Sequence, residues 1–292
     1  MHIRDKIEFF LFLSLSKFFS ILKLKRTRKF AKLFALFVYY CVPIRKKIVF
    51  SNLQKAFPSL SAKEISMIAK KNYFNIILTF FELMYFPYMK KEELLTLAEC
   101  DELKLVIEKY NERKGLILIT GHYGSWEIGA AWVGAKTNIP MYVMAKPQRN
   151  RYVTEWINKA REKFGNKVVP LGVSVREIYS VIKNGGLIGV VGDQRGPKEG
   201  LRVNFLGNET AVYSGTAQIA IKTNCPILVG LIERKADLNY KIFLYEINPL
   251  SLQGERTDDK VKMLNQKYFN LLEKHVKEHP EQWFWMHKIW KY

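Results

Sequence analysis

Cysteine and acidic residues are scarce in this chain of 292 residues. Its three cysteines, Cys41, Cys100 and Cys225, are widely scattered, which argues against a disulfide framework or a zinc site and indicates reduced thiols. Lys and Arg number 47 against 27 Asp and Glu, so the net charge is +20. Such a surface attracts polyanions, whether nucleic acid, anionic lipid headgroups or an acidic protein. The basic residues do not alternate with aromatics as in an RNA-binding signature.

Several catalytic motifs are also absent. The sequence contains no G-x-G-x-x-G and no Walker A motif. The G-x-S-x-G elbow of a serine hydrolase is excluded at Ser125, because Tyr123 and Glu127 occupy its glycine positions. His275 and His279 are four residues apart on an expected helix, but no glutamate directly follows the first histidine. Ordinary helix-end histidines are therefore favoured over a metal site, and we expect no metal ligands in the chain.

The N-terminal residues 1–48 lack an uninterrupted apolar span of about 20 residues. Lys17 interrupts the apolar stretch 7–22, and Lys32 interrupts the stretch 30–44. Through residue 50, twelve Lys and Arg accompany only two Asp and Glu. Apolar helices flanked by cations are typical of segments that lie in or dip into an anionic membrane, so residues 1–48 are predicted to be a helical membrane-associating segment. A core helix hairpin is the alternative, and a cleaved signal peptide is disfavoured because no A-x-A site is visible and the cations follow the apolar run.

Residues 49–292 are predicted to form a single α/β domain. Ser61 begins the capping box SAKE, which predicts a helix running toward Tyr85, and a second helical pattern covers residues 94–110. Strands are expected at 116–120, 140–145, 167–171, 187–192, 226–232 and 240–247, and helices at 125–136, 151–164, 175–183, 212–223 and 257–278. This alternation predicts a mostly parallel central sheet flanked by helices.

The stretch GHYGSWEIGA, residues 121–130, follows the apolar run LILIT at the expected end of a strand. Reactive groups in such sheets lie outside the carboxyl ends of the strands, where both His122 and Asp193 are placed. On one regular helix His122 and Glu127 would point roughly 140° apart, so they meet only if His122 lies in the turn. Glu127 would then orient His122 as a general base that deprotonates an acceptor hydroxyl. The spacing alone is equally compatible with a buried histidine and a solvated glutamate.

GHYGSWEIGA resembles the H-x4-D/E signature of membrane-associated glycerolipid acyltransferases, and its surroundings resemble the late acyltransferases of lipid A biosynthesis, the lauroyl and myristoyl transferase family. Four segments carry this resemblance in family order: GHYGSWEIGA, MAKPQRNRYVTEWINKAREKFG, VVGDQRGPKEGLRVNFLGNETAVYSGTAQIAIKTNCPILVG and HPEQWFWMHKIWK. The resemblance implies transfer of a fatty acyl chain from acyl carrier protein to a hydroxyl of a lipid A precursor, within lipopolysaccharide biosynthesis. It implies a location at the cytoplasmic face of the inner membrane, contact with its lipids, no cofactor and no nucleic acid partner.

The resemblance also implies roles for individual residues. His122 and Glu127 match the family's catalytic pair. Asn150 and Arg161 match an asparagine and an arginine of the second segment, and Asp193 matches the acidic position of the third. These three are expected to bind substrate or stabilise an oxyanion.

Lys146 departs from the family, which often has Arg there, and the loss of a bidentate donor puts phosphate clamping at this position in doubt. The cations of the loop after Asp193 are expected to contact phosphates or the acidic carrier protein, although solvated loop charges are an equal alternative. These cations are Arg195, Lys198 and Arg202. The terminal aromatics from Trp283 to Trp290 fit either a membrane interface or packing against the sheet.

Three other functions remain open at this point. The same chemistry would serve a lysophospholipid or a glycosylated phosphoinositide as the acceptor. The positive charge would also suit a membrane-tethered protein that binds nucleic acid. A catalytically silent homologue of the acyltransferases is the third alternative.

Overall fold

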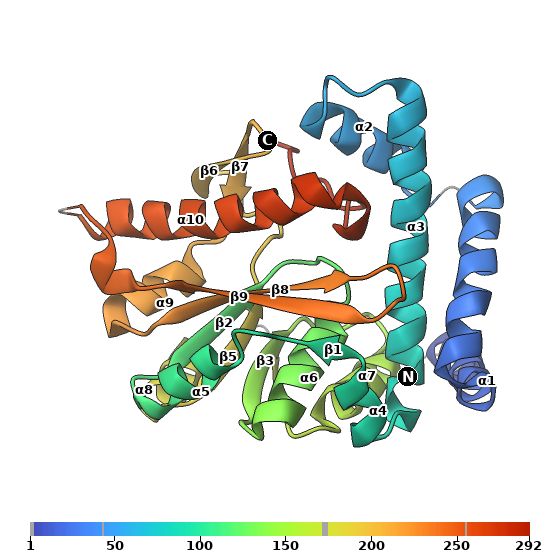
Figure 1. The fold of residues 1–292 in the computed structure, drawn as a ribbon, viewed down its shortest axis with the longest axis horizontal. Coiled ribbons are helices and arrows are strands. Elements are labelled where there is room, and N and C mark those ends of the chain that lie inside the picture. The colour runs from blue at the N-terminus through green and yellow to red at the C-terminus, as the bar shows by residue number, and fades with distance from the viewer. Residues whose placement is uncertain (1–2, 43, 171–174, 255) are drawn as a thin grey trace.

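A seven-stranded sheet forms the centre of the computed structural model, which describes residues 3–42, 44–170, 175–254 and 256–292 (Figure 1). The strand order is β1-β9-β8-β2-β5-β3-β4. The strands are β1 (Ala98–Glu99), β2 (Leu116–Thr120), β3 (Met141–Ala145), β4 (Lys167–Pro170), β5 (Leu187–Val191), β8 (Ile227–Arg234) and β9 (Tyr240–Ile247). Strands β8, β2, β5, β3 and β4 run parallel to one another. Strand β9 is antiparallel to β8, and β1 is parallel to β9. The predicted mostly parallel sheet is confirmed.

Helices cover both faces of this sheet and enclose two apolar cores. One face carries α4 (Lys91–Thr96), α5 (Lys104–Asn111), α6 (Trp126–Thr137) and α7 (Arg151–Glu162). The other carries α8 (Val175–Lys183), α9 (Gly215–Thr223) and α10 (Thr257–Glu278). Short 3₁₀ turns occupy Phe86–Tyr88, Pro249–Ser251 and Pro280–Gln282. The central strands are therefore shielded from water on both sides, as their continuous apolar composition predicts.

Strand β2 shows how the sequence specifies this arrangement. Its first four residues are buried, and successive side chains alternate between the two faces. Leu116 and Leu118 join the core beneath α6, whereas Ile117 and Ile119 join the core beneath α10. The strand thus lies in the middle of the sheet, and its carboxyl end delivers residue 122 to the sheet's edge.

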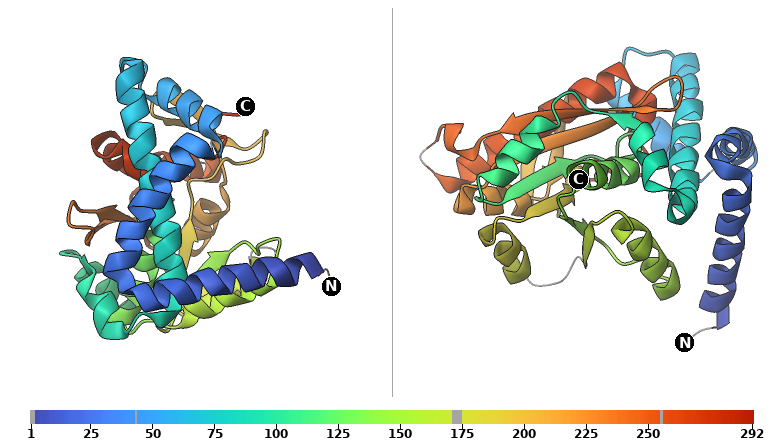
Figure 2. Two further views of the ribbon diagram at one scale, coloured as in Figure 1. Left: turned by 90° about the vertical axis from the view of Figure 1, so that its right-hand side faces the viewer. Right: turned by 60° about the horizontal axis from the view of Figure 1, so that its bottom comes forward.

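The N-terminal segment is the helix α1 (Ile3–Cys41), which is kinked where Lys23 adopts φ 60° and ψ 164°. Its two arms lie alongside α7 and α3 (Ala62–Tyr85), as Figure 2 shows, and α2 (Lys46–Ala56) follows. Many large apolar side chains on α1 are exposed: Ile3, Ile7, Phe10, Leu11, Phe18, Ile21, Phe30, Leu33, Phe34, Phe37 and Tyr40. Among the described residues, no helix combines the length and apolarity needed to span a bilayer.

Most boundaries predicted from the sequence are close to those observed. The capping box at the start of α3 is confirmed, with Ser61 Oγ accepting from the amide of Glu64 and the Glu64 carboxylate accepting from the amide of Ser61. The single helix predicted over 94–110 is wrong, because the short strand β1 separates α4 from α5. Leu171, predicted as the end of a strand, lies outside the described residues.

A two-stranded hairpin, β6 (Leu201–Phe205) and β7 (Asn208–Val212), was not predicted. Its two-residue turn, Leu206 and Gly207, has positive φ at both positions (52° and 73°), as tight hairpins require. Leucine is unusual in that conformation, and the ordinary Asn-Gly signal is missing from the sequence. Burial of the Leu206 side chain and a hydrogen bond from its amide to Glu273 hold the turn in place.

Candidate active site

His122 and Asp193 form a close pair at the carboxyl edge of the sheet. Strand β2 ends just before His122 and strand β5 just before Asp193, and the two strands are parallel neighbours in register from Leu116 and Leu187 onward. His122 Nδ1 lies 2.6 Å from Asp193 Oδ1. Adjacency in the sheet thus joins two residues that are 71 positions apart in sequence.

Asp193 is completely buried, and its second carboxylate oxygen is also bonded. Oδ2 accepts from the His122 amide at 2.7 Å and from the indole Nε1 of Trp283 at 2.7 Å. Burial by itself would raise the pKa of this carboxyl, but the facing His122 and these hydrogen bonds lower it below its usual range. Asp193 is therefore held as a carboxylate that points at the imidazole.

The ionised Asp193 determines which nitrogen of His122 carries the proton. A carboxylate only accepts hydrogen bonds, so Nδ1 donates and Nε2 keeps its lone pair. Burial pulls the pKa of His122 downward, whereas the charge and hydrogen bond of Asp193, and then the charge of Glu127, outweigh it and raise the pKa. The result is an oriented imidazole with a free basic nitrogen, as general-base catalysis requires.

Glu127 lies in the first turn of the next helix, as predicted, but its hydrogen bonds go to Arg161 and not to the imidazole. This helix is α6, and the two carboxylate oxygens of Glu127 accept from Arg161 of α7, from Nε at 2.9 Å and from Nη2 at 2.5 Å. The predicted hydrogen bond from His122 to Glu127 is replaced by the bond to Asp193. The physical reason is that α7 brings the Arg161 guanidinium to Glu127, while the pairing of β5 with β2 brings Asp193 to His122 Nδ1.

An apolar cavity of about 310 Å³ opens beside this pair, between α6, α7 and the sheet. Both His122 and the Glu127–Arg161 pair line it. Its sheet wall contains Gly189 of β5 and Gly230 of β8, on either side of Leu118 of β2. A Cβ would lie 2.6 Å from Met141 Sδ at Gly189 and 3.1 Å from Leu118 Cδ1 at Gly230, so these glycines let neighbouring side chains pack closely over the strands. The remaining wall is mainly apolar: Trp126, Ala130, Val133, Met141, Val143, Met144, Ala145, Val190, Val191, Ile232, Ile242 and Leu244.

The other residues predicted for the site are distributed around this cavity. Lys146 lines its wall and is exposed. Asn150 instead caps α7, accepting from the amides of Tyr152 and Val153, and its side-chain amide donates to the Asp5 carbonyl of α1. The buried Asn150 thus joins two helices and is not among the residues that line the cavity.

The loop after Asp193 and the start of β6 carry the three cations that the sequence analysis singled out. Arg195 donates to the Lys288 carbonyl at 2.8 Å, and Arg202 donates to the Lys198 carbonyl at 2.8 Å. Within the described part of the chain, none of the three forms an ion pair with an acidic side chain. Their charges are therefore uncompensated at this edge of the sheet.

Trp283, one of the terminal aromatics noted in the sequence, lies beside the site, but its hydrogen bond to Asp193 was not predicted. It is fully buried, as is Trp285, so the packing alternative for these tryptophans is correct and a membrane interface is wrong for both. The amide of Phe284 donates to the His122 carbonyl at 3.0 Å, and the Phe284 ring lies 5.9 Å from the imidazole. The C-terminal segment thus supports the turn that carries His122.

Known proteins are similar to this chain over a range that includes every residue of the site. The family described as bacterial lipid A biosynthesis acyltransferase matches residues 2–292. The lipid A biosynthesis palmitoleoyltransferase of Escherichia coli (strain K12) is 25% identical over 256 residues, which is 85% of this chain and 79% of that protein. The lipid A biosynthesis lauroyltransferase of the same organism is 22% identical over 252 residues, with the same coverage of both chains. A lipid A biosynthesis acyltransferase of Shigella flexneri is also 25% identical.

Proposed function

Because the chain belongs to the bacterial lipid A biosynthesis acyltransferase family and is thus an acyltransferase, we propose that it moves a fatty acyl chain from acyl carrier protein to a hydroxyl of a lipid A precursor. One observation carries this proposal. An aspartate-bound imidazole with a free Nε2 lies at the wall of an apolar cavity, so a base and a site for an acyl chain adjoin.

In the proposed reaction, His122 Nε2 takes the proton of the acceptor hydroxyl as the hydroxyl oxygen attacks the carbonyl carbon of the donor thioester. Asp193 stabilises the imidazolium that forms. The tetrahedral intermediate carries its negative charge on the former carbonyl oxygen. When it collapses, the carbon–sulfur bond breaks and the leaving thiolate takes the proton from His122, so the new ester forms without a covalent enzyme intermediate.

The negative charge of the intermediate requires hydrogen-bond donors. Arg161 faces the cavity, and the amides at the start of α6 have no acceptor within their own helix. We propose that these groups stabilise the oxyanion and that Glu127 holds Arg161 in position. The acyl chain would occupy the cavity between α6 and the sheet, and Lys146 would contact the donor or acceptor at the cavity wall. We propose that these steps need no cofactor, because each proton transfer is assigned to His122.

Residues 1–48 are proposed as the membrane-associating segment, with residues 49–292 as the catalytic domain. The exposed apolar residues of α1 are accompanied by exposed cations: Arg4, Lys6, Lys17, Lys23, Lys25, Arg26, Lys29 and Lys32. Apolar surface next to cations suits the anionic cytoplasmic face of the inner membrane. Aromatic contacts from Phe9 to Tyr152 and from Phe12 to Trp156 join α1 to α7, which also carries Arg161. A lipid acceptor in that membrane would therefore lie near the cavity.

The uncompensated cations Arg195, Lys198 and Arg202 follow Asp193 in the chain. We propose that they bind phosphates of the lipid A precursor or the acidic surface of the carrier protein, since both are anionic. Binding at this loop would weaken as salt is raised, because exposed charges are screened.

An acyl-transfer assay tests the proposed function. Purified protein in detergent would be given acyl carrier protein loaded with a fatty acyl chain as the donor. The acceptors, each tested separately, would be a Kdo-containing lipid A precursor, a lysophospholipid and a glycosylated phosphoinositide. We expect transfer to the lipid A precursor and a loss of about 10³-fold in His122→Ala, with thermal unfolding unchanged. No transfer to that precursor, or full activity in His122→Ala, would refute the proposal.

A further inference from the structure

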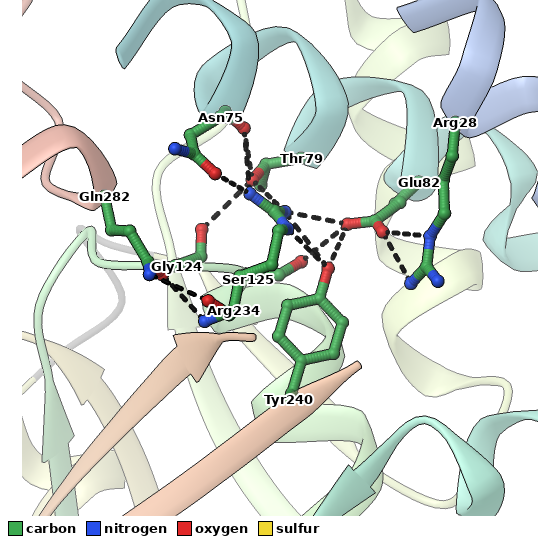
Figure 3. A network of polar contacts seen from close by, with 9 residues as sticks. All are labelled: Arg28, Asn75, Thr79, Glu82, Gly124, Ser125, Arg234, Tyr240 and Gln282. Carbon is green, nitrogen blue, oxygen red and sulfur yellow. Dashed lines mark hydrogen bonds and ion pairs between the residues drawn. The ribbon is translucent and has the colours of Figure 1, made fainter. Parts of the chain in front are cut away.

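A buried polar network adjoins Gly124 and Ser125 of the turn that carries His122 (Figure 3). Glu82 of α3 is its centre and is completely buried. One carboxylate oxygen accepts from Arg28 Nε at 2.8 Å, and the other accepts from Arg234 Nη2 at 3.0 Å. The hydroxyl of Tyr240 also donates to Glu82. Four elements, α1, α3, β8 and β9, therefore meet at one carboxylate.

This network contacts the His122 turn directly. Ser125 Oγ donates to Glu82 Oε2 at 3.3 Å, and Thr79 Oγ1 lies 3.0 Å from the Gly124 carbonyl. The Thr79 hydroxyl also lies 2.9 Å from the Asn75 carbonyl of its own helix, so its one proton is shared between two carbonyls. It accepts from Arg234 Nη2 at 3.1 Å, the same nitrogen that binds Glu82. Figure 3 shows Gly124 and Ser125 directly beside these side chains.

The opposite side of the turn is held by the C-terminal segment. The Gly124 amide donates to the Gln282 carbonyl at 3.0 Å, and the Gln282 side chain bonds both the amide and the carbonyl of Arg234. Every bond to Gly124 thus leads to Arg234 or to a residue bonded to it. A shift of Arg234 would move the backbone two residues from His122.

Arg28 is the one contributor to the network from α1, the helix with the exposed apolar surface. Its side chain is buried and its guanidinium compensates the Glu82 carboxylate from the side opposite Arg234. The other cations of this part of α1, such as Arg26, are exposed. Arg28 therefore links the packing of α1 to the buried network, whereas Arg26 contributes only surface charge.

We infer that Glu82 and Thr79 are positioning residues for His122, and that Arg28 makes this positioning depend on the packing of α1 against α3. The inference rests on the proposed role of His122 as the base. It extends that role by making the membrane-facing helix part of the support of the active site. A base misplaced by about 1 Å costs up to 100-fold in rate, so small movements of the turn are measurable.

The first test uses a conservative pair at Thr79. Thr79→Val removes the hydroxyl and keeps the shape of the side chain, whereas Thr79→Ser keeps the hydroxyl. We expect Thr79→Val to lower kcat about tenfold with an unchanged KM for the lipid acceptor, and Thr79→Ser to restore kcat to within about twofold. The acid limb of the pH profile should also move to lower pH in Thr79→Val, because a displaced His122 loses part of its bond to Asp193. Equal kcat in Val and Ser variants would overturn the role of the hydroxyl.

The second test compares two arginines of α1. Arg28→Met and Arg26→Met remove the same charge from the same helix, but only Arg28 contacts Glu82. With detergent-dispersed acceptor, we expect kcat to fall about fivefold or more in Arg28→Met and to stay at the wild-type value in Arg26→Met. An equal effect of the two variants, or wild-type kcat in Arg28→Met, would overturn the link to α1. Wild-type protein and His122→Ala are assayed alongside, so that failure of the proposed function is recognised separately.

Discussion

Two glutamate–arginine pairs flank the His122 turn and differ mainly in enclosure. The Glu127–Arg161 side chains keep 12% and 18% of their surface exposed and line the cavity. Glu82 is 0% exposed and is held by two arginines, with side chains 9% and 2% exposed, and by Tyr240. Glu127 is hydrogen-bonded to Arg161, and a substrate oxyanion or phosphate in the cavity would compete for that arginine. Glu82 has partners on α1, β8 and β9 and in the His122 turn, and it is not among the residues that line the cavity, so it fixes backbone geometry.

The comparison teaches that ion-pair chemistry alone does not define a role. A buried pair with every partner present is costly to disrupt, because removing one member leaves an uncompensated charge. A pair at a cavity wall exchanges partners at lower cost, because water and ligand reach it. We therefore expect loss of the buried pair to lower stability most, with a smaller fall in kcat from the displaced turn, and loss of the cavity pair to lower catalysis most.

The largest expected effect tests whether Glu127 is able to replace Asp193. Asp193→Asn should lower kcat/KM about 100-fold, because Glu127 is bound to Arg161 and does not orient His122. In its proposed role as the base His122 must be neutral, so activity should rise with pH through its pKa. Asp193 raises that pKa, and its loss should move the acid limb to lower pH. A pH–rate profile measures both effects.

The control for this variant is Asp237→Asn, which changes an exposed aspartate in the β8–β9 turn. Its profile should match that of the wild type. An unshifted acid limb with undiminished kcat/KM in Asp193→Asn would show that another group orients His122. The assignment of Asp193, and not Glu127, as the partner of His122 would then be wrong.

The next prediction compares Glu82 and Glu127 by the free energy of unfolding that each contributes. Glu82→Gln should lower the free energy of unfolding by about 3–5 kcal/mol, since it leaves buried arginines without a carboxylate. Glu127→Gln should cost only about 1–2 kcal/mol, since one hydrogen bond to Arg161 is retained. Denaturant unfolding in one detergent measures both values. Equal losses would contradict the assignment of separate roles.

The smallest effect concerns the cavity wall. Gly230→Ala adds a methyl group 3.1 Å from Leu118 Cδ1 and narrows the cavity. We expect preference among acyl donors to shift about tenfold toward shorter chains. Competition between donors of different length, read by mass spectrometry, measures the shift. Gly215→Ala, where the new methyl meets no atom within 4 Å, should leave the preference unchanged.

Local signals in the sequence were sufficient for most of the fold. The capping box at Ser61 and Glu64 and the apolar run of β2 depend on neighbours within a few positions, so their consequences are readable along the chain. The spacing also placed His122 at the end of a strand. Which carboxylate faces the ring could not be predicted, because that depends on β5 being adjacent to β2 in the sheet.

The buried network around Glu82 could not be predicted from the sequence for a related reason. Glu82 lies in the more apolar second half of α3, and its sequence position does not distinguish a solvated from a buried carboxylate. Its partners Arg28 and Arg234 are 54 and 152 positions away. Only the packing of α1 on α3, and of α3 against the end of β8, brings the three charges together.

Gly124 has a consequence for attempts to redesign this enzyme. It adopts φ +58°, and a Cβ there would lie 1.9 Å from the Ile232 carbonyl oxygen. No side chain fits that gap, and the conformation itself disfavours one. A randomised library over residues 121–125 that is selected for acyl transfer should thus return glycine at this position. Any surviving clone with another residue there would have reached activity through a different backbone.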